Sequence, residues 1–305
     1  MSKQSIVHVE TAMSLPSREE DSKLASVLLS TLKKRRTLPE PAKGPFWPAS
    51  FFGLDRCSVY LNASKSEQDD ILLCCSASVL EEAYFIEKAG MAFAAKMVLL
   101  SKTVEERMLY SLFASDEATH FELIRRFVNE AAVDCESNPF LALLSGFIES
   151  GQPLALQFVV QIVLEGWGLA YYRDLAKGCT DEPLRTVFDA ILRDEASHHG
   201  SGLVLFSEEE RSESVSKQII EVMMKFLGMV QLGPQAVCAS IERVVGPFTG
   251  EKRIKIFQEL NASTHSAQRL ELLRNLMLKS GAEDIVEALE QEGCFVACSP
   301  QECAQ

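Results

Sequence analysis

The sequence predicts an all-α protein built on a four-helix bundle, with additional N- and C-terminal helices. Three observations support this prediction. Apolar residues recur at helical spacing through most of the 305 residues. No stretch sustains the apolar–polar alternation of a half-buried strand. A five-residue motif occurs twice, as Asp-Glu-Ala-Thr-His at 116–120 and Asp-Glu-Ala-Ser-His at 194–198. Paired Glu-x-x-His motifs of this kind are typical of metal sites inside helix bundles.

Residues 1–65 are predicted to form an N-terminal helix and a proline-rich connector. The helix is expected at 18–35, where acidic residues lead and basic residues trail, as the helix dipole favours. The basic run at 33–36 has the composition of a localisation signal, but the solvated last turn of a helix has it too, and we favour that interpretation. Four prolines within 38–48 indicate a stiff connector.

Residues 66–212 are predicted to form the bundle. Helices are expected at 66–100, 104–132, 138–149, 153–177 and 181–206. Thr103, followed three residues later by Glu106, is a capping box for the second of these helices. Thr180 is the expected cap of the last one, with Pro183 in its first turn.

Residues 213–305 are predicted to form a helical extension that packs on the bundle and ends in a cysteine-containing tail. Its helices are expected at 214–231, 234–246, 251–261, 264–279 and 282–291. The tail cysteines Cys294, Cys298 and Cys303 have no matching His, so we expect free thiols. The chain has nine cysteines and no signal-peptide pattern, which favours a reducing, cytoplasmic compartment.

The net charge and the hydropathy of the chain argue against nucleic acid and membranes as binding partners. The formal net charge of −13 argues against nucleic acid, because phosphate binding needs a basic face. The stretch 153–172 is long and apolar enough to span a membrane, and Glu165 is its one charged residue. A central carboxylate is costly in lipid, whereas a helix buried in a bundle is apolar on all sides. We therefore expect a buried helix and no membrane contact.

The two five-residue motifs belong to an internal repeat. They are offset by 78 residues (194 − 116), and the same offset aligns Glu87 with Glu165 and Gly90 with Gly168. In both halves the upstream Glu precedes the Glu of the five-residue motif by 30 residues (117 − 87 and 195 − 165). That separation suits a helix, a short turn and an antiparallel helix that returns to the same level.

The repeat selects a set of candidate metal ligands. They are Glu87, Glu117, His120, Glu165, Glu195 and His198. Glu82 is the alternative to Glu87, but its helical face runs toward Lys96, whereas that of Glu87 is apolar. Four buried carboxylates need compensating cations, and this donor set favours two iron ions, with manganese at one or both positions as the alternative. Asp116 and Asp194 are predicted to orient the ligand His of the opposite helix.

This constellation resembles that of the ferritin-like non-haem di-iron carboxylate proteins. These include ribonucleotide reductase small subunits, bacterial multicomponent monooxygenases, p-aminobenzoate N-oxygenases, aldehyde-deformylating oxygenases and ferritins. The resemblance covers about residues 70–206 and implies a ferritin-like core, iron, and dioxygen or peroxide chemistry. Two positions depart from family patterns: Ile124 stands where the reductases have their radical Tyr, and Ile191 where the N-oxygenases have an extra ligand His.

The surroundings of the ligands suggest an organic substrate. Gly90, Gly166 and Gly168 lie within one turn of the ligands and leave room for one. The residues expected to make that space apolar are Phe85, Met91, Phe121, Trp167 and Leu169. We therefore expect a monooxygenase or oxidase that uses O2 as co-substrate to hydroxylate, desaturate, N-oxygenate or cleave a small, largely apolar molecule. No catalytic residue is expected beyond the metal ligands.

Two further expectations follow. No flavin or iron–sulfur motif is visible, so electrons would come from an external donor. An iron-binding ferroxidase or storage protein without an organic substrate is the alternative function. The oligomeric state stays open, with a homodimer among the candidates.

Overall fold

The all-α class is confirmed. The computed structural model describes residues 22–40, 42–130, 139–207 and 210–305. Within these ranges the regular elements are helices, and no β-strand occurs. In the N-terminal part these are α1 (Lys23–Arg35), the short 3-10 turns η1 (Ala49–Phe52) and η2 (Leu54–Arg56), and α2 (Ser58–Leu61).

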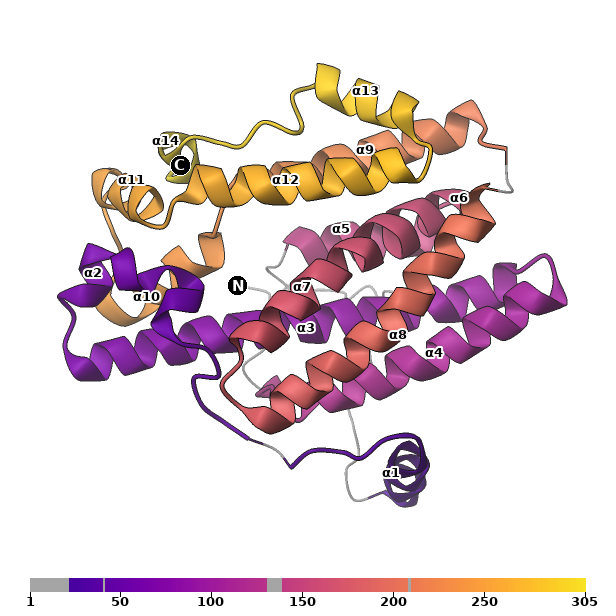
Figure 1. Ribbon diagram of the computed structural model, residues 1–305, viewed down its shortest axis with the longest axis horizontal. Helices are drawn as coiled ribbons and strands as arrows, with labels where there is room; N and C mark the ends of the chain where they lie inside the picture. The colour runs from indigo at the N-terminus through magenta and orange to yellow at the C-terminus, as the bar shows by residue number, and fades with distance from the viewer. Residues whose placement is uncertain (1–21, 41, 131–138, 208–209) are drawn as a thin grey trace, which may run out of the picture.

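Two helical hairpins form the centre of the molecule (Figure 1). The first joins α3 (Lys65–Leu100) to α4 (Val104–Arg125), and these helices share the most extensive contact in the described chain. The second joins α7 (Glu165–Gly178) to α8 (Glu182–Ser207). Because α4 also packs against α8, the two hairpins face each other across a common interior.

The helix that carries Glu165 is not α-helical throughout. It begins as α6 (Pro153–Leu156), continues as the π-helical segment η4 (Gln157–Leu164), and becomes α7 at Glu165. From 153 to 178 it is long and apolar enough to cross a membrane by length and composition alone. However, 72% of its most apolar window is buried inside the protein, as in the core helix of a globular protein.

The remaining helices cover this core. α5 (Pro139–Ser150) packs on α3. The C-terminal helices are α9 (Glu213–Gln231), α10 (Gln235–Val245), α11 (Gly250–Glu259), α12 (Ala262–Lys279), α13 (Glu283–Gln291) and α14 (Pro300–Cys303). Among them α9 and α12 lie against η4, and α10 lies against α3 (Figure 1). The described cysteines are free thiols.

Helix ends agree with expectation within two residues, apart from the start of α1 and the end of α4. The first helix was expected from residue 18, but α1 begins at Lys23, because the hydroxyl of Ser22 caps it by accepting the N–H of Ala25. Helix α4 ends at Arg125 and not at 132; residues 131–138 lie outside the described chain. Thr103 caps α4 by accepting the N–H of Glu106. The expected cap at Thr180 is wrong: its hydroxyl donates to the carbonyl of Phe46, and Asp181 accepts a backbone N–H of the first turn of α8 instead. Asp ranks above Thr as an N-cap.

Candidate metal centre

The six candidate ligands come together in the interior. Glu87 comes from α3, Glu117 and His120 from α4, Glu165 from α7, and Glu195 and His198 from α8. Their ligand atoms form two groups, each within 4.8 Å: Glu87, Glu117, His120 and Glu195; and Glu117, Glu165, Glu195 and His198. Glu117 and Glu195 belong to both groups. They therefore lie where two carboxylates can bridge a pair of ions.

Both imidazoles present the same nitrogen to the carboxylates. The Nδ1 atom of His120 lies 3.2 Å from Glu87 Oε2 and 3.6 Å from Glu195 Oε1. The Nδ1 atom of His198 lies 3.1 Å from Glu117 Oε1. Each ring therefore has Nδ1 available as a metal ligand, while Nε2 points out of the cluster.

Several of these atoms lack hydrogen-bond partners among the described residues, although they are buried. They are Glu87 Oε2, Glu165 Oε2, His120 Nδ1 and His198 Nδ1. Buried polar atoms are normally paired, and an ion-binding site is one standard reason for an exception. All four belong to the two ligand groups, so the residues present fit a pair of cations.

The electrostatics point the same way. Burial, with the nearby charge of Glu195, raises the pKa of Glu117 to about 8. The same two causes raise the pKa of Glu165 well above its ordinary value. Burial lowers the pKa of His120, but hydrogen bonds to Asp194 and Glu87 outweigh it and raise the pKa overall. Without cations this cluster retains protons, and divalent metals would replace them.

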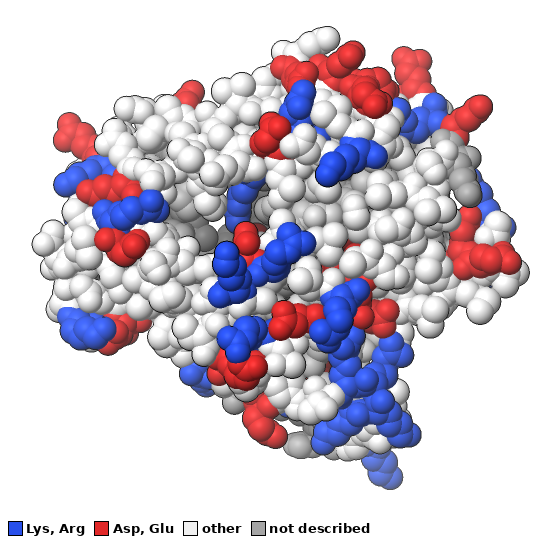
Figure 2. Space-filling view, viewed as in Figure 1, with Lys and Arg blue, Asp and Glu red and all other residues white. Residues whose placement is uncertain are grey.

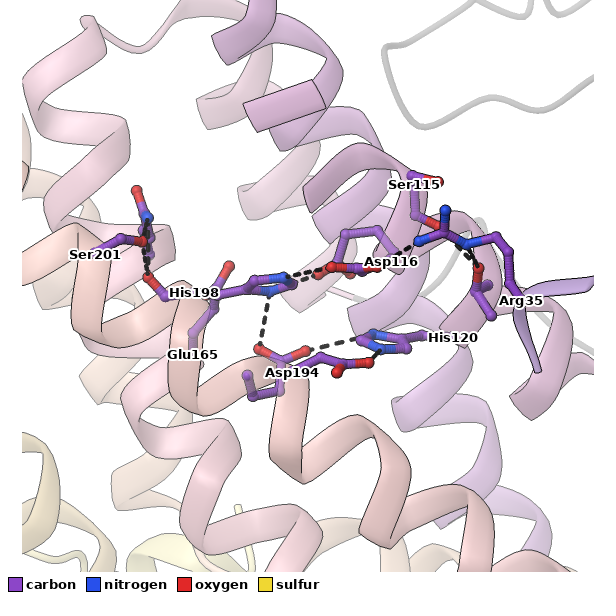
Figure 3. Close-up of polar contacts among 12 residues, drawn as sticks. Arg35, Ser115, Asp116, His120, Glu165, Asp194, His198 and Ser201 are labelled. Atoms are coloured by element: carbon purple, nitrogen blue, oxygen red, sulfur yellow. Dashed lines mark hydrogen bonds and ion pairs between the residues drawn. The ribbon is translucent and has the colours of Figure 1, made fainter. Parts of the chain in front are cut away.

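Asp116 and Asp194 lie behind the two imidazoles, each on the hairpin opposite to the His it faces (Figure 3). Asp194 Oδ2 accepts a hydrogen bond from His120 Nε2 at 2.9 Å. Asp116 Oδ2 lies 3.7 Å from His198 Nε2. The hydrogen bond to Asp194 holds the Nε2 side of His120, so its Nδ1 would be the atom offered to a metal. Asp116 is too far from His198 Nε2 for a hydrogen bond, and that nitrogen has no hydrogen-bond partner among the described residues.

Glu82 lies outside both ligand groups. Its Oε2 accepts a hydrogen bond from Tyr171 at 3.3 Å. Burial raises its pKa, partly offset by the positive charge of Arg269. Of the two first-helix candidates, Glu87 is the one in the cluster.

Three features of the site escaped the sequence reasoning. Tyr172, a fully buried residue, donates a short hydrogen bond to Glu87 Oε1. It stands seven residues after Glu165, on the same helical face, and that spacing could have revealed it. Arg35 and Arg36 contact the two aspartates from 81 and 158 residues away, and no local pattern predicts such contacts.

The third unexpected feature is the π-helical segment η4, which leads directly into Glu165. Tyr110 of α4 donates to Gln161 Oε1 at 2.9 Å, and Gln161 Nε2 donates to the carbonyl of His198 at 2.9 Å. Gln157 donates to the Tyr110 hydroxyl. This buried network ties the π-helical turn to both Glu-x-x-His helices. Single π-helical turns are frequent at functional sites.

A small apolar cavity borders the cluster on one side. Its walls include the ligands Glu117, Glu165 and Glu195 and the side chains of Ile86, Leu144, Val160, Leu164 and Trp167. Of the apolar residues expected there, Trp167 is present, whereas Phe85, Met91, Phe121 and Leu169 do not line it. Glu87 is also absent from the lining, so the cavity adjoins the Glu165 half of the cluster.

The three glycines near the ligands have different surroundings. A Cβ at Gly90 would collide with the carboxylate of Glu117, whereas a Cβ at Gly168 would meet nothing within 4 Å. Both line the cavity. A Cβ at Gly166 would lie 2.8 Å from the ring of His199. Gly166 therefore allows close packing against His199, and Gly90 leaves the space that the carboxylate of Glu117 occupies.

The chain was compared with known proteins. No model of a known protein family matches it, and no curated protein matches it either. The buried Glu/His cluster of this helical protein is compatible with a di-iron site.

Proposed function

We propose that this chain is a ferritin-like non-haem di-iron oxygenase or oxidase that acts on a small, largely apolar organic molecule. The observation that carries the proposal is the pair of ligand groups sharing Glu117 and Glu195 beside an apolar cavity. In this proposal α3, α4, α8 and the helix containing Glu165 are the four helices of the ferritin-like bundle. Such a bundle supplies a Glu from each of two helices and Glu-x-x-His from each of the others.

The residues divide the ligand roles between two ions. Glu87 and His120 would hold one ion, Glu165 and His198 the other, and Glu117 and Glu195 would be shared. An iron pair, when bound, supplies the redox chemistry that activates dioxygen. Carboxylate and imidazole ligands suit iron or manganese better than a thiolate-preferring metal.

The chain's own residues prepare the site for that chemistry. Tyr172 orients the carboxylate of Glu87 by its hydrogen bond. Asp194 would accept a hydrogen bond from the Nε2–H of His120 and so favour the tautomer that exposes Nδ1. Leu144, Val160 and the other apolar walls exclude water from the side facing Glu165.

The cavity defines the class of substrate. Its charged lining groups are the ligand carboxylates, and the remaining walls are predominantly apolar. A substrate would bind there by apolar contact, with its reacting atom toward the Glu165 half of the cluster. A site for mineral growth needs no such enclosed apolar space, and this favours an oxygenase or oxidase over iron storage.

The decisive experiment measures iron and oxygen together. The purified protein is loaded with ferrous iron without oxygen, iron per chain is determined, and dioxygen uptake is followed with a chemical reductant as electron donor. Small apolar compounds are then added in turn. We expect two irons per chain and uptake stimulated by a subset of compounds. Two irons with mineral accumulation and no stimulation would indicate storage, and less than one metal per chain would refute the site.

A further inference from the structure

The last turn of α1 contacts the outer side of the candidate metal centre. Arg35 Nη2 lies 2.7 Å from Asp116 Oδ1, and Arg36 Nη2 forms an ion pair with Asp194 Oδ2. Arg35 also donates to the hydroxyl of Thr119 at 3.2 Å. Lys33, Lys34 and Arg35 are exposed in the last turn of α1, as expected of a solvated turn, but the contacts of the two arginines with aspartates were not expected. Figure 2 shows how densely Lys and Arg side chains cover this corner of the surface.

The contacts form two chains of side chains, and Figure 3 shows the first of them, from Arg35 through Asp116 to His198. Arg35 holds Asp116, which faces His198. Arg36 holds Asp194, which is hydrogen-bonded to His120. Two adjacent residues of one segment thus reach both halves of the cluster. Each half is reached through one aspartate.

Each arginine is placed to restrain the orientation of one aspartate carboxylate. Arg35 takes Oδ1 of Asp116, which leaves Oδ2 directed at Nε2 of His198. The Asp116 and Asp194 side chains are 30% and 23% exposed, so each carboxylate has solvent within reach of rotation. A guanidinium restrains such a carboxylate in one orientation, because its planar donors match the carboxylate oxygens.

We propose that Arg35 and Arg36 are positioning residues of the metal centre, each for one half. Arg35 acts through Asp116 on His198, and Arg36 acts through Asp194 on His120. The inference rests on the proposed function to the extent that the cluster binds metal, and it requires no particular reaction. It makes the N-terminal helix a part of the site.

The same contacts couple the docking of α1 to metal binding. Ala25 and Leu32 are the buried residues of this 13-residue helix, so apolar burial holds it weakly and the two ion pairs matter. If docked α1 strengthens metal binding, bound metal must strengthen the docking of α1 by the same factor. Amide hydrogen exchange of α1 in the unaltered protein should therefore slow when metal is added.

The variants Arg35→Gln and Arg36→Gln test the assignment directly. Stepwise binding of Mn²⁺ is measured by chelator competition, with Lys33→Gln and Lys34→Gln as controls that remove the same charge from exposed positions of the same turn. We expect each arginine variant to weaken binding about threefold to fivefold, the upper range for partly exposed ion pairs. The lysine variants should bind like the unaltered protein.

A double-mutant cycle identifies which half each arginine serves. In a His198→Ala background, Arg35→Gln should have no further effect on Mn²⁺ affinity, whereas Arg36→Gln should keep its full effect. A His120→Ala background should reverse this pattern, because mutations in one chain of contacts are not additive. Thermal unfolding of the metal-free variants separates this effect from a general loss of stability.

The outcomes are distinct. Two metals bound by the unaltered protein, with arginine variants indistinguishable from the lysine controls, would overturn the inference and leave the proposed function standing. Additive effects in both histidine backgrounds would also overturn it. No metal bound by the unaltered protein would overturn both. Should an arginine variant misfold, unchanged exchange of α1 on metal addition to the unaltered protein would still refute the coupling.

Discussion

Gly90→Ala should abolish metal binding while the protein stays folded. A Cβ at this position would lie 2.7 Å from Glu117 Cδ and would overlap the carboxylate oxygen more severely. Ordinary van der Waals contact begins at 3.4 Å, so the carboxylate must shift by about 1 Å. Metal–ligand distances tolerate about 0.2 Å. Because Glu117 belongs to both ligand groups, both ions are affected.

The size of the effect follows from these contacts. Loss of an outer partner of a ligand costs about 10- to 100-fold in metal affinity, and displacement of a shared ligand should cost more than 100-fold. The metal-free protein should change little. Alanine gains about 1 kcal/mol over glycine inside a helix, and overpacking costs about 1–3 kcal/mol. The net cost is therefore about 0–2 kcal/mol, which leaves the protein folded.

The internal repeat provides the matched control, since Gly168 aligns with Gly90 under the 78-residue offset (168 − 90). A Cβ at Gly168 meets nothing within 4 Å, so Gly168→Ala should keep two metals per chain. Elemental analysis after loading with ferrous iron measures binding, and thermal unfolding of the metal-free proteins measures stability. Normal loading of Gly90→Ala, or equal loss in Gly168→Ala, would refute the reasoning.

Three other predictions concern the ligands and their neighbours. Tyr172→Phe removes the donor to Glu87 and should weaken metal affinity about tenfold in chelator competition, with two metals still bound at saturation. Glu87→Ala should lose metal by elemental analysis, whereas Glu82→Ala should bind two ions, because Glu82 lies outside both groups; the reverse pattern would reject Glu87 as a ligand. The pKa of Glu117 is raised from 4.5 to about 8, so the metal-free folded chain holds a proton that the unfolded chain releases. Its stability to urea should therefore fall as pH rises from about 4.5 to 8, and a flat profile would contradict this.

The positions of the candidate ligands could be predicted because they depend on local geometry and on the repeat. Glu and His three residues apart share a helical face wherever a helix forms. The 78-residue offset then paired Glu87 with Glu165, and it separated Glu87 from Glu82. Helix ends were likewise readable from caps such as Thr103. These signals are spacings and residue types that can be seen in the sequence itself.

Other features depend on packing between distant segments. The contacts of Arg35 and Arg36 join residues 81 and 158 positions apart, and nothing in a solvated basic run distinguishes them. The π-helical form of η4 was also not predicted, since α- and π-helical versions of a largely apolar stretch have the same composition. It is stabilised by the buried contacts of Gln161 with Tyr110 and the His198 carbonyl. Short elements such as α2 and α14 have too few residues to show a period.

The differences between the two repeat halves bear on how the site would work. Tyr172 holds Glu87, but its counterpart under the offset is Ala94, which has no donor for Glu165. Both glutamates keep an unpartnered Oε2 among the described residues, but Glu165 faces the cavity that Glu87 does not line. One half of the cluster is therefore restrained by a hydrogen bond from Tyr172, and the other adjoins the apolar cavity. A duplicated ligand motif would thus serve two roles, with Glu87 fixing one ion and Glu165 free to move as the other reacts.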